Sequence, residues 1–155
     1  MPASAHDTFT KLLFDRLLTM PGLRVAMVDW PDVPFTPPRE AAAKGGDKPS
    51  KYVSVAYTPN TSDLSGFAYD SEVTDTGLLA LNATCPAGQG VLPAIQFAQQ
   101  LVNVFLPGLV LYDPTTKAEV RIIEQPRVAS PLEGTDNLTI PVIVRWVATT
   151  PKSGS

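Results

Sequence analysis

Residues 51–58 read Lys-Tyr-Val-Ser-Val-Ala-Tyr-Thr, and residues 77–84 read Gly-Leu-Leu-Ala-Leu-Asn-Ala-Thr. In the first stretch Val53, Val55 and Tyr57 alternate with the intervening residues at the two-residue period of a β-strand. The second stretch alternates in the same way, and a polar, turn-rich connection separates the two. We therefore predict two strands that form a long hairpin with an extended tip.

Two amphipathic helices are predicted outside this hairpin. The first spans residues 4–19 and ends at Pro21-Gly22, and the second spans residues 91–105 and ends at Pro107-Gly108. Each carries apolar residues at helical spacing along one side, so each is expected to bury one face.

The remaining apolar segments predict shorter strands in a single α+β domain. Because Pro141 cannot donate a ladder hydrogen bond, the last strand is expected to lie at an edge or to be bulged. This order of elements favours an antiparallel or mixed β-sheet with two main helices packed on one face. We expect one domain over residues 1–148 and a flexible C-terminal tail over 149–155. The further predicted segments are strands at 24–30, 109–112, 118–124 and 138–148 and a proline-rich loop at 31–50.

The composition fits one folded protein of 155 residues, with 44% hydrophobic and 17% charged residues. No stretch reaches the roughly 18 uninterrupted apolar residues that a membrane span requires. The first residues lack the basic start and apolar run of a signal peptide. Cys85 is the only cysteine, so no internal disulfide can form, which suits a reducing cytosol.

The sequence lacks the residues of common catalytic and metal sites. His6 is the only histidine and lies near a terminus, which argues against histidine catalysis and, together with the single cysteine, against a zinc site. Gly88-Gln-Gly90 resembles half of a dinucleotide fingerprint, but the third glycine is missing. We therefore predict no catalytic, metal or cofactor site and no enzymatic activity. The alternative is a small ligand-binding or enzymatic domain that uses the Gly88–Gly90 turn as an anion site.

The middle of the chain is acidic. The net charge of −3 argues against a protein that binds nucleic acid by neutralising phosphates. No Lys or Arg occurs between Lys51 and Lys117. A solvated acidic loop is the simpler interpretation, and a surface that repels polyanions is the alternative. The acidic residues that we consider for such a surface are Asp63, Asp70, Glu72 and Asp75.

Four aromatic residues fall in otherwise polar connections. Such residues either cover the core of their own chain or form the centre of an interface with another protein, where aromatic side chains are enriched. We take them as candidate interface residues: Trp30, Phe35, Phe67 and Tyr69.

The order of segments over residues 5–148 resembles the tail terminator, or tail-completion, proteins of long-tailed bacteriophages, especially siphophages. The likeness rests on the first helix ending in Met-Pro-Gly-Leu-Arg-Val, on the Pro-rich stretch 30–38 and on the strand Tyr-Val-Ser-Val-Ala-Tyr-Thr-Pro. The segment 77–90 that leads into the second helix and the closing strands between 124 and 146 extend it.

This resemblance implies a structural virion protein without catalytic residues. It implies a homohexameric ring that caps the tail tube, ends tube elongation and joins the head-side connector or stopper protein, while DNA passes through the ring. Its place would be the tail or neck of the virion, assembled in the host cytoplasm. The four acidic residues would then repeat around the channel or its rim. A neck or head–tail connector ring protein is the alternative.

Overall fold

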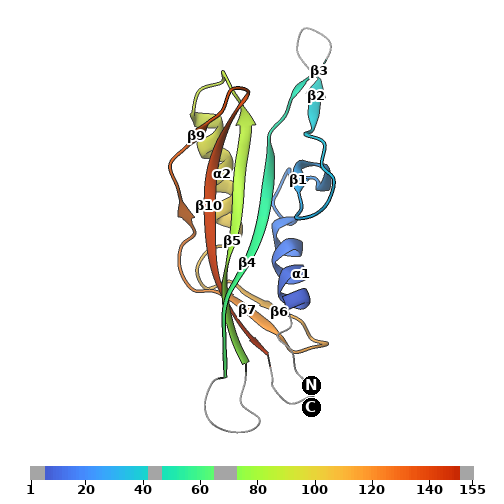
Figure 1. Ribbon diagram of the computed structural model, residues 1–155, viewed down its shortest axis with the longest axis vertical. Coiled ribbons are helices and arrows are strands. Elements are labelled where there is room, and N and C mark those ends of the chain that lie inside the picture. The colour runs from blue at the N-terminus through green and yellow to red at the C-terminus, as the bar shows by residue number, and fades with distance from the viewer. Residues whose placement is uncertain (1–5, 42–46, 65–72, 151–155) are drawn as a thin grey trace.

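The computed structural model describes residues 6–41, 47–64 and 73–150, and it has the predicted α+β architecture (Figure 1). Two α-helices and one short 3-10 helix accompany a mixed sheet of eight strands and a separate pair of strands. The elements are α1 (His6–Leu17), η1 (Val25–Met27), β1 (Val28–Asp29), β2 (Arg39–Ala41), β3 (Asp47–Pro49), β4 (Tyr52–Leu64), β5 (Val73–Pro86), α2 (Leu92–Val104), β6 (Val110–Tyr112), β7 (Glu119–Ile122), β8 (Arg127–Val128), β9 (Leu132–Glu133) and β10 (Asn137–Thr150).

Three long strands form the centre of the large sheet. The strand order is β1-β4-β5-β10-β7-β6, and β8 and β9 also pair with β10. The short β1 runs parallel to β4, and the other pairs are antiparallel. The sheet is therefore mixed, as one of the two predicted alternatives stated.

The predicted long hairpin is the pair β4–β5. Both strands extend further toward the tip than the sequence indicated, because β4 continues to Leu64 and β5 already begins at Val73. A register shift between Pro59 and Thr61 lets the pairing pass the proline. The hairpin reaches one end of the elongated molecule, and the β2–β3 pair lies at the opposite end (Figure 1).

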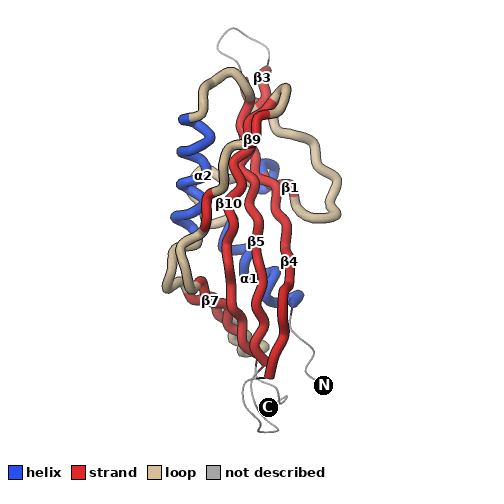
Figure 2. Tube along the Cα trace, turned by 60° about the vertical axis from the view of Figure 1, so that its left-hand side comes forward, coloured by secondary structure: helices blue, strands red, loops and turns tan. Residues whose placement is uncertain are grey.

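Both helices cover the same face of the sheet, and the core lies between them and the strands (Figure 2). This inner face of the sheet is built from alternate residues of β4, β5 and β10, most of which are buried. Their neighbours are half-buried or exposed, except Thr84 of β5, which is also buried. The largest fully buried side chains come from all these elements and are Trp146, Phe9, Phe97, Phe105, Leu13, Leu17, Leu79, Leu81, Leu101, Ile122, Ile140 and Val53.

Trp146 fills the inner face near the hairpin arm because its strand neighbour is a glycine. Gly77 lies directly opposite Trp146 in the β5–β10 register. A Cβ atom at Gly77 would lie 2.3 Å from the Trp146 ring and 2.6 Å from the carbonyl oxygen of Thr58. The glycine thus permits the indole to lie across the strand, where it stacks on Tyr57 with ring centroids 5.3 Å apart.

The expectation that the last strand lies at an edge or is bulged is wrong, because β10 pairs with β5 along its whole length and with β7, β8 and β9 on its other side. The Pro141 carbonyl accepts a hydrogen bond from the Ala129 amide, so the missing N–H of Pro141 faces that same side. There the pairing with β9 ends at Thr139 and the pairing with β8 begins at Val142. The proline therefore occupies a break between two short partner strands.

Three further segments differ from the sequence-based expectation. The strand predicted at 24–30 is η1 followed by the two-residue β1. The loop predicted at 31–50 contains the β2–β3 pair. Strand β10 includes Thr149 and a buried Thr150, which the sequence assigned to a tail, because both pair with β5. Residues 151–155 lie outside the described part of the chain.

Candidate interaction surfaces

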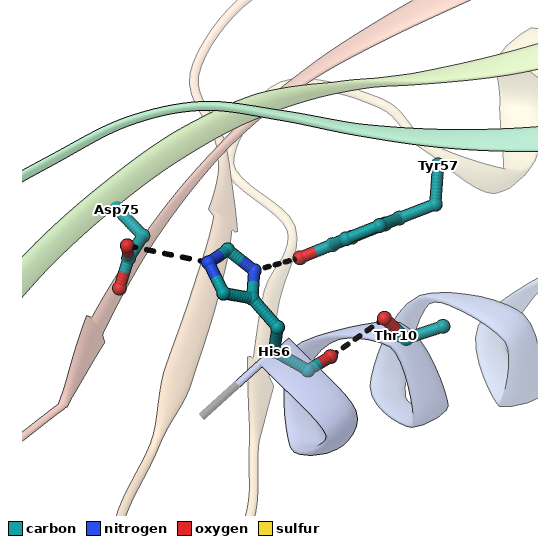
Figure 3. Close-up of polar contacts among 4 residues, drawn as sticks. All are labelled: His6, Thr10, Tyr57 and Asp75. Atoms are coloured by element: carbon teal, nitrogen blue, oxygen red, sulfur yellow. Dashed lines mark hydrogen bonds and ion pairs between the residues drawn. The ribbon is translucent and has the colours of Figure 1, made fainter. Parts of the chain in front are cut away.

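His6 holds the first turn of α1 against the sheet (Figure 3). Its Nδ1 lies 2.5 Å from the hydroxyl oxygen of Tyr57, and its Nε2 lies 3.6 Å from Oδ1 of Asp75. The hydroxyl of Thr10 donates to the His6 carbonyl oxygen over 2.6 Å, which closes the same helical turn. The sequence placed His6 near a terminus that frays, whereas the structure ties it to two strands.

The surroundings of His6 indicate a structural tie. The rings of Phe9 and Trp146 approach the imidazole edge-on, with centroids 5.5 and 6.3 Å away. Burial raises the pKa of Tyr57 to about 12, so its hydroxyl stays protonated near neutral pH. Because both imidazole nitrogens already have neighbours within the chain, we assign this cluster to anchoring α1.

The other candidates for chemistry are Cys85, the possible metal ligands and the Gly88–Gly90 turn. Cys85 is buried, and burial raises the pKa of its thiol, which disfavours the reactive thiolate. No cluster of His, Cys, Asp or Glu suited to a metal ion occurs among residues 6–41, 47–64 and 73–150. Gly88 and Gly90 have φ angles of +88° and +79°, so the strand-to-helix turn itself requires both glycines.

The four acidic candidates do not form one surface in the described structure. Asp75 points to the inner face, where its side chain is 0% exposed beside His6. We therefore correct the expectation for Asp75, because a carboxylate covered by α1 cannot line a channel. Asp63 pairs with Thr74 near the end of the β4–β5 hairpin. Asp70 and Glu72 lie outside the described residues.

The two described aromatic candidates pack against their own chain. Trp30 lies 4.6 Å from Phe14 of α1, and Phe35 lies 5.1 Å from Tyr52 of β4, measured between ring centroids. Both side chains are half-buried. A role for them in binding another protein therefore stays a prediction, and Phe67 and Tyr69 lie outside the described residues.

On the face of the sheet opposite α1 and α2, no helix lies over β4, β5 and β10 in the described part of the chain (Figure 2). We call this face the open face. Its residues stand opposite one another in rows across β4, β5 and β10, such as Ala56–Ala80–Ile143. Among the residues of this face given below, Arg145 is the one ionisable side chain and is paired with Glu124 at 3.1 Å. Asp29 of β1, which accepts a hydrogen bond from Ser54, and Arg121 of β7, opposite Val147, border the face. The open face consists of Ser54, Ala56, Thr58, Leu78, Ala80, Asn82, Pro141, Ile143, Arg145 and Val147.

The outward side of α2 is the second uncharged surface. Leu92 is 61% exposed and Ile95 is 46% exposed, and Gln99 donates a hydrogen bond to Asn103 over 3.1 Å. These four residues lie at helical spacing, and we call them the α2 ridge. No residue of α2 is ionisable. By contrast, the outward stripe of α1 carries Asp7, Lys11 and Asp15.

The sequence contains a signal for both surfaces that is a matter of composition and belongs to no motif. Residues 76–112 include no Asp, Glu, Lys, Arg or His. This stretch supplies most of β5, all of α2 and all of β6. A strand and a helix that are exposed on one side usually carry charged residues there, so the charge-free run marks surfaces suited to burial.

A family model described as phage tail terminator protein matches residues 8–146 of the 155. The chain belongs to the phage tail terminator family. This match confirms the resemblance to the tail terminator proteins. The protein is therefore a structural component of the phage tail and is associated with tail and head-side parts of the virion.

The comparison with solved structures supports the fold of this tail terminator. One solved chain superposes with a TM-score of 0.68 at 20% sequence identity, over 99% of this chain and 100% of that chain. No curated protein matches at the sequence level. Among the described residues, neither helix is long and apolar enough to cross a bilayer.

Proposed function

We propose that this tail terminator forms a hexameric ring at the end of the phage tail tube. The ring stops tube elongation, offers a joining surface to the head-side connector or stopper protein and leaves a channel for DNA. The observation that carries this proposal is the family match over residues 8–146. The protein acts through shape and contact, in the virion of a siphophage-type particle assembled in the host cytoplasm.

The elongated form of the subunit supports this role. The β4–β5 hairpin and the β2–β3 pair lie at opposite ends of the molecule (Figure 1). A ring whose subunits project a hairpin from each end can meet the tube on one side and the connector on the other. Loops and hairpin ends are also the parts of a fold that most often carry binding residues.

The acidic hairpin remains part of this proposal. Asp63, Asp70 and Glu72 would repeat around the ring, so that a few carboxylates form a charged rim that repels passing DNA. Asp75 is excluded by its burial. A ring structure with all three remaining residues on its outer wall would contradict this assignment.

The proposal is tested by adding the purified protein to growing tail tubes and imaging them by electron microscopy. We expect a ring at one end of each tube and tubes that stop lengthening once the protein is added, because a capped end cannot add further subunits. Tubes that keep elongating with the protein present, or protein that binds along the tube wall, would refute the proposed role. Omitting the protein and adding an unrelated acidic protein of similar size are the controls.

A further inference from the structure

The open face has the composition of a buried surface. In β5 the run Gly77-Leu-Leu-Ala-Leu81 is apolar on both faces, although helices cover only one of them. Sheets with one wet face normally alternate apolar and polar residues, whereas strands covered on both faces carry continuous apolar runs. Leu78 and Ala80 are the outward members of this run, and Ile143 of β10 continues the patch. The strand sequence therefore indicates a second covering layer.

The shape of this patch is suited to packing against a helix. Ala56, Ala80 and Ile143 stand side by side across three strands, and Ser54, Asn82 and Pro141 form the next row. Apart from Ile143, these side chains are small or short, and they leave a shallow surface on which a helix can lie, as in folds with helices on both faces of a sheet. Five residues along these strands span about 17 Å.

The α2 ridge matches that patch in length and character. A helix of 13 residues is about 20 Å long. Leu92 and Ile95 present apolar side chains, and Gln99 and Asn103 are bonded to each other, so burying the ridge leaves no charge without a partner. The outward stripe of α1 would leave Asp7 and Asp15 buried in such a contact and is unsuited to it.

We propose that the α2 ridge of one copy of this chain lies on the open face of the next copy. This inference rests on the proposed ring and names its subunit contact. The two surfaces lie on opposite sides of the same sheet, so one subunit can use both at once and the contact repeats head to tail, as a closed ring requires. Each sheet in the ring then has a helix layer on both faces. DNA does not fit as the partner, because the α2 ridge carries no charge and Arg145 of the open face is already paired with Glu124.

Disulfide cross-linking tests the pairing of these surfaces. Ala80→Cys lies on the open face and Gln99→Cys on the α2 ridge, and the sheet separates them within one subunit, so only neighbouring copies can link them. Buried Cys85 stays in every variant and in the wild-type control. After oxidation on tail tubes, we expect the double variant to give covalent dimers and larger multimers on a non-reducing gel. Each single variant is expected to stay monomeric on that gel. Strong cross-linking of Ala80→Cys alone, or rings without cross-links in the double variant, would overturn the inference.

A charge on the ridge gives an independent test. Ile95→Glu should lower the fraction of tubes that carry a ring about ten-fold or more, because the carboxylate would be buried without a partner. Val25→Glu is the matched control, since Val25 is 63% exposed in η1 and lies on neither surface. Urea unfolding of each variant checks that the subunit still folds.

The two proposals fail in different ways. If Ile95→Glu caps tubes as well as wild type does, the subunit contact is wrong and the ring proposal stands. If wild type forms no ring on tubes at all, the proposed function is wrong and the contact is wrong with it.

Discussion

Strands β4, β5 and β10 carry apolar residues on both the inner face and the open face, but the two faces differ in what covers them. β5 contributes Leu79 and Leu81 to the inner face and Leu78 and Ala80 to the open face. The helices of the same chain cover only the inner one. Alternation therefore shows which residues share a face. The scarcity of charged residues on the open face, where Arg145 is paired with Glu124, favours burial of that face by a partner.

The sharpest test of this comparison replaces each of two neighbouring leucines of β5 by alanine. Leu79→Ala on the inner face should lower the free energy of unfolding by about 2–5 kcal/mol, because it leaves a cavity in a packed core. Leu78→Ala on the open face should cost less than about 1 kcal/mol in the isolated subunit. Urea denaturation of both variants measures the difference, and equal losses would show that the two faces are covered alike.

A second test adds volume to the inner face. Gly77→Ala should destabilise the subunit by about 1–3 kcal/mol, because its Cβ would collide with the ring of Trp146 and the carbonyl of Thr58. If the indole causes most of this loss, the same change should cost less in a Trp146→Leu background. Additive losses in this double-mutant cycle, again measured by urea denaturation, would show that the collision with Trp146 is unimportant.

The inner face should also make stability fall at high pH. The pKa of Tyr57 is raised from 10.0 to about 12 by burial, so between these values the unfolded chain ionises and the folded chain does not. Since the unfolded state then binds fewer protons, the free energy of unfolding decreases as pH rises through this window. Tyr57→Phe should reduce that decrease. Urea denaturation at pH 9 and pH 11 checks this, and identical pH dependence in both proteins would count against it.

The smallest effect is expected for the single charged residue of the open face. Arg145 and Glu124 form an ion pair at 3.1 Å with side chains that are 64% and 49% exposed. Arg145→Ala should change the free energy of unfolding by less than about 1 kcal/mol, because solvent screens such pairs. A larger loss in urea denaturation would mean that the open face contributes to folding of the lone subunit.

The long elements of the fold could be predicted from the sequence. The alternation of residues 51–58 and 77–84 gave the β4–β5 hairpin, and the apolar stripes gave α1 and α2. The strands expected at 109–112 and 118–124 are β6 and β7, but the two-residue strands could not be found in the same way. β1 and β8 have two residues each, so no periodicity can develop, and their pairing depends on the longer strands beside them.

The fate of individual side chains depended on tertiary packing. Asp75 counted as a surface acid from its sequence context, but its position in β5 points it inward and His6 of α1 covers it. Pro141 argued for an edge strand, but it lies where two partner strands leave a gap. Such placements depend on which elements meet in space, and local sequence does not contain that information.

The charge-free run of residues 76–112 has a consequence for how the protein responds to its medium. Dissolved ions weaken attraction between charges, with a screening length of about 10 Å at 0.1 M salt, but they have no charges to screen along this run. Contacts made through its strand and helix should therefore depend less on salt concentration than contacts between charged side chains do. If the proposed subunit contact forms, its strength should change little between the cell and water of a different salinity.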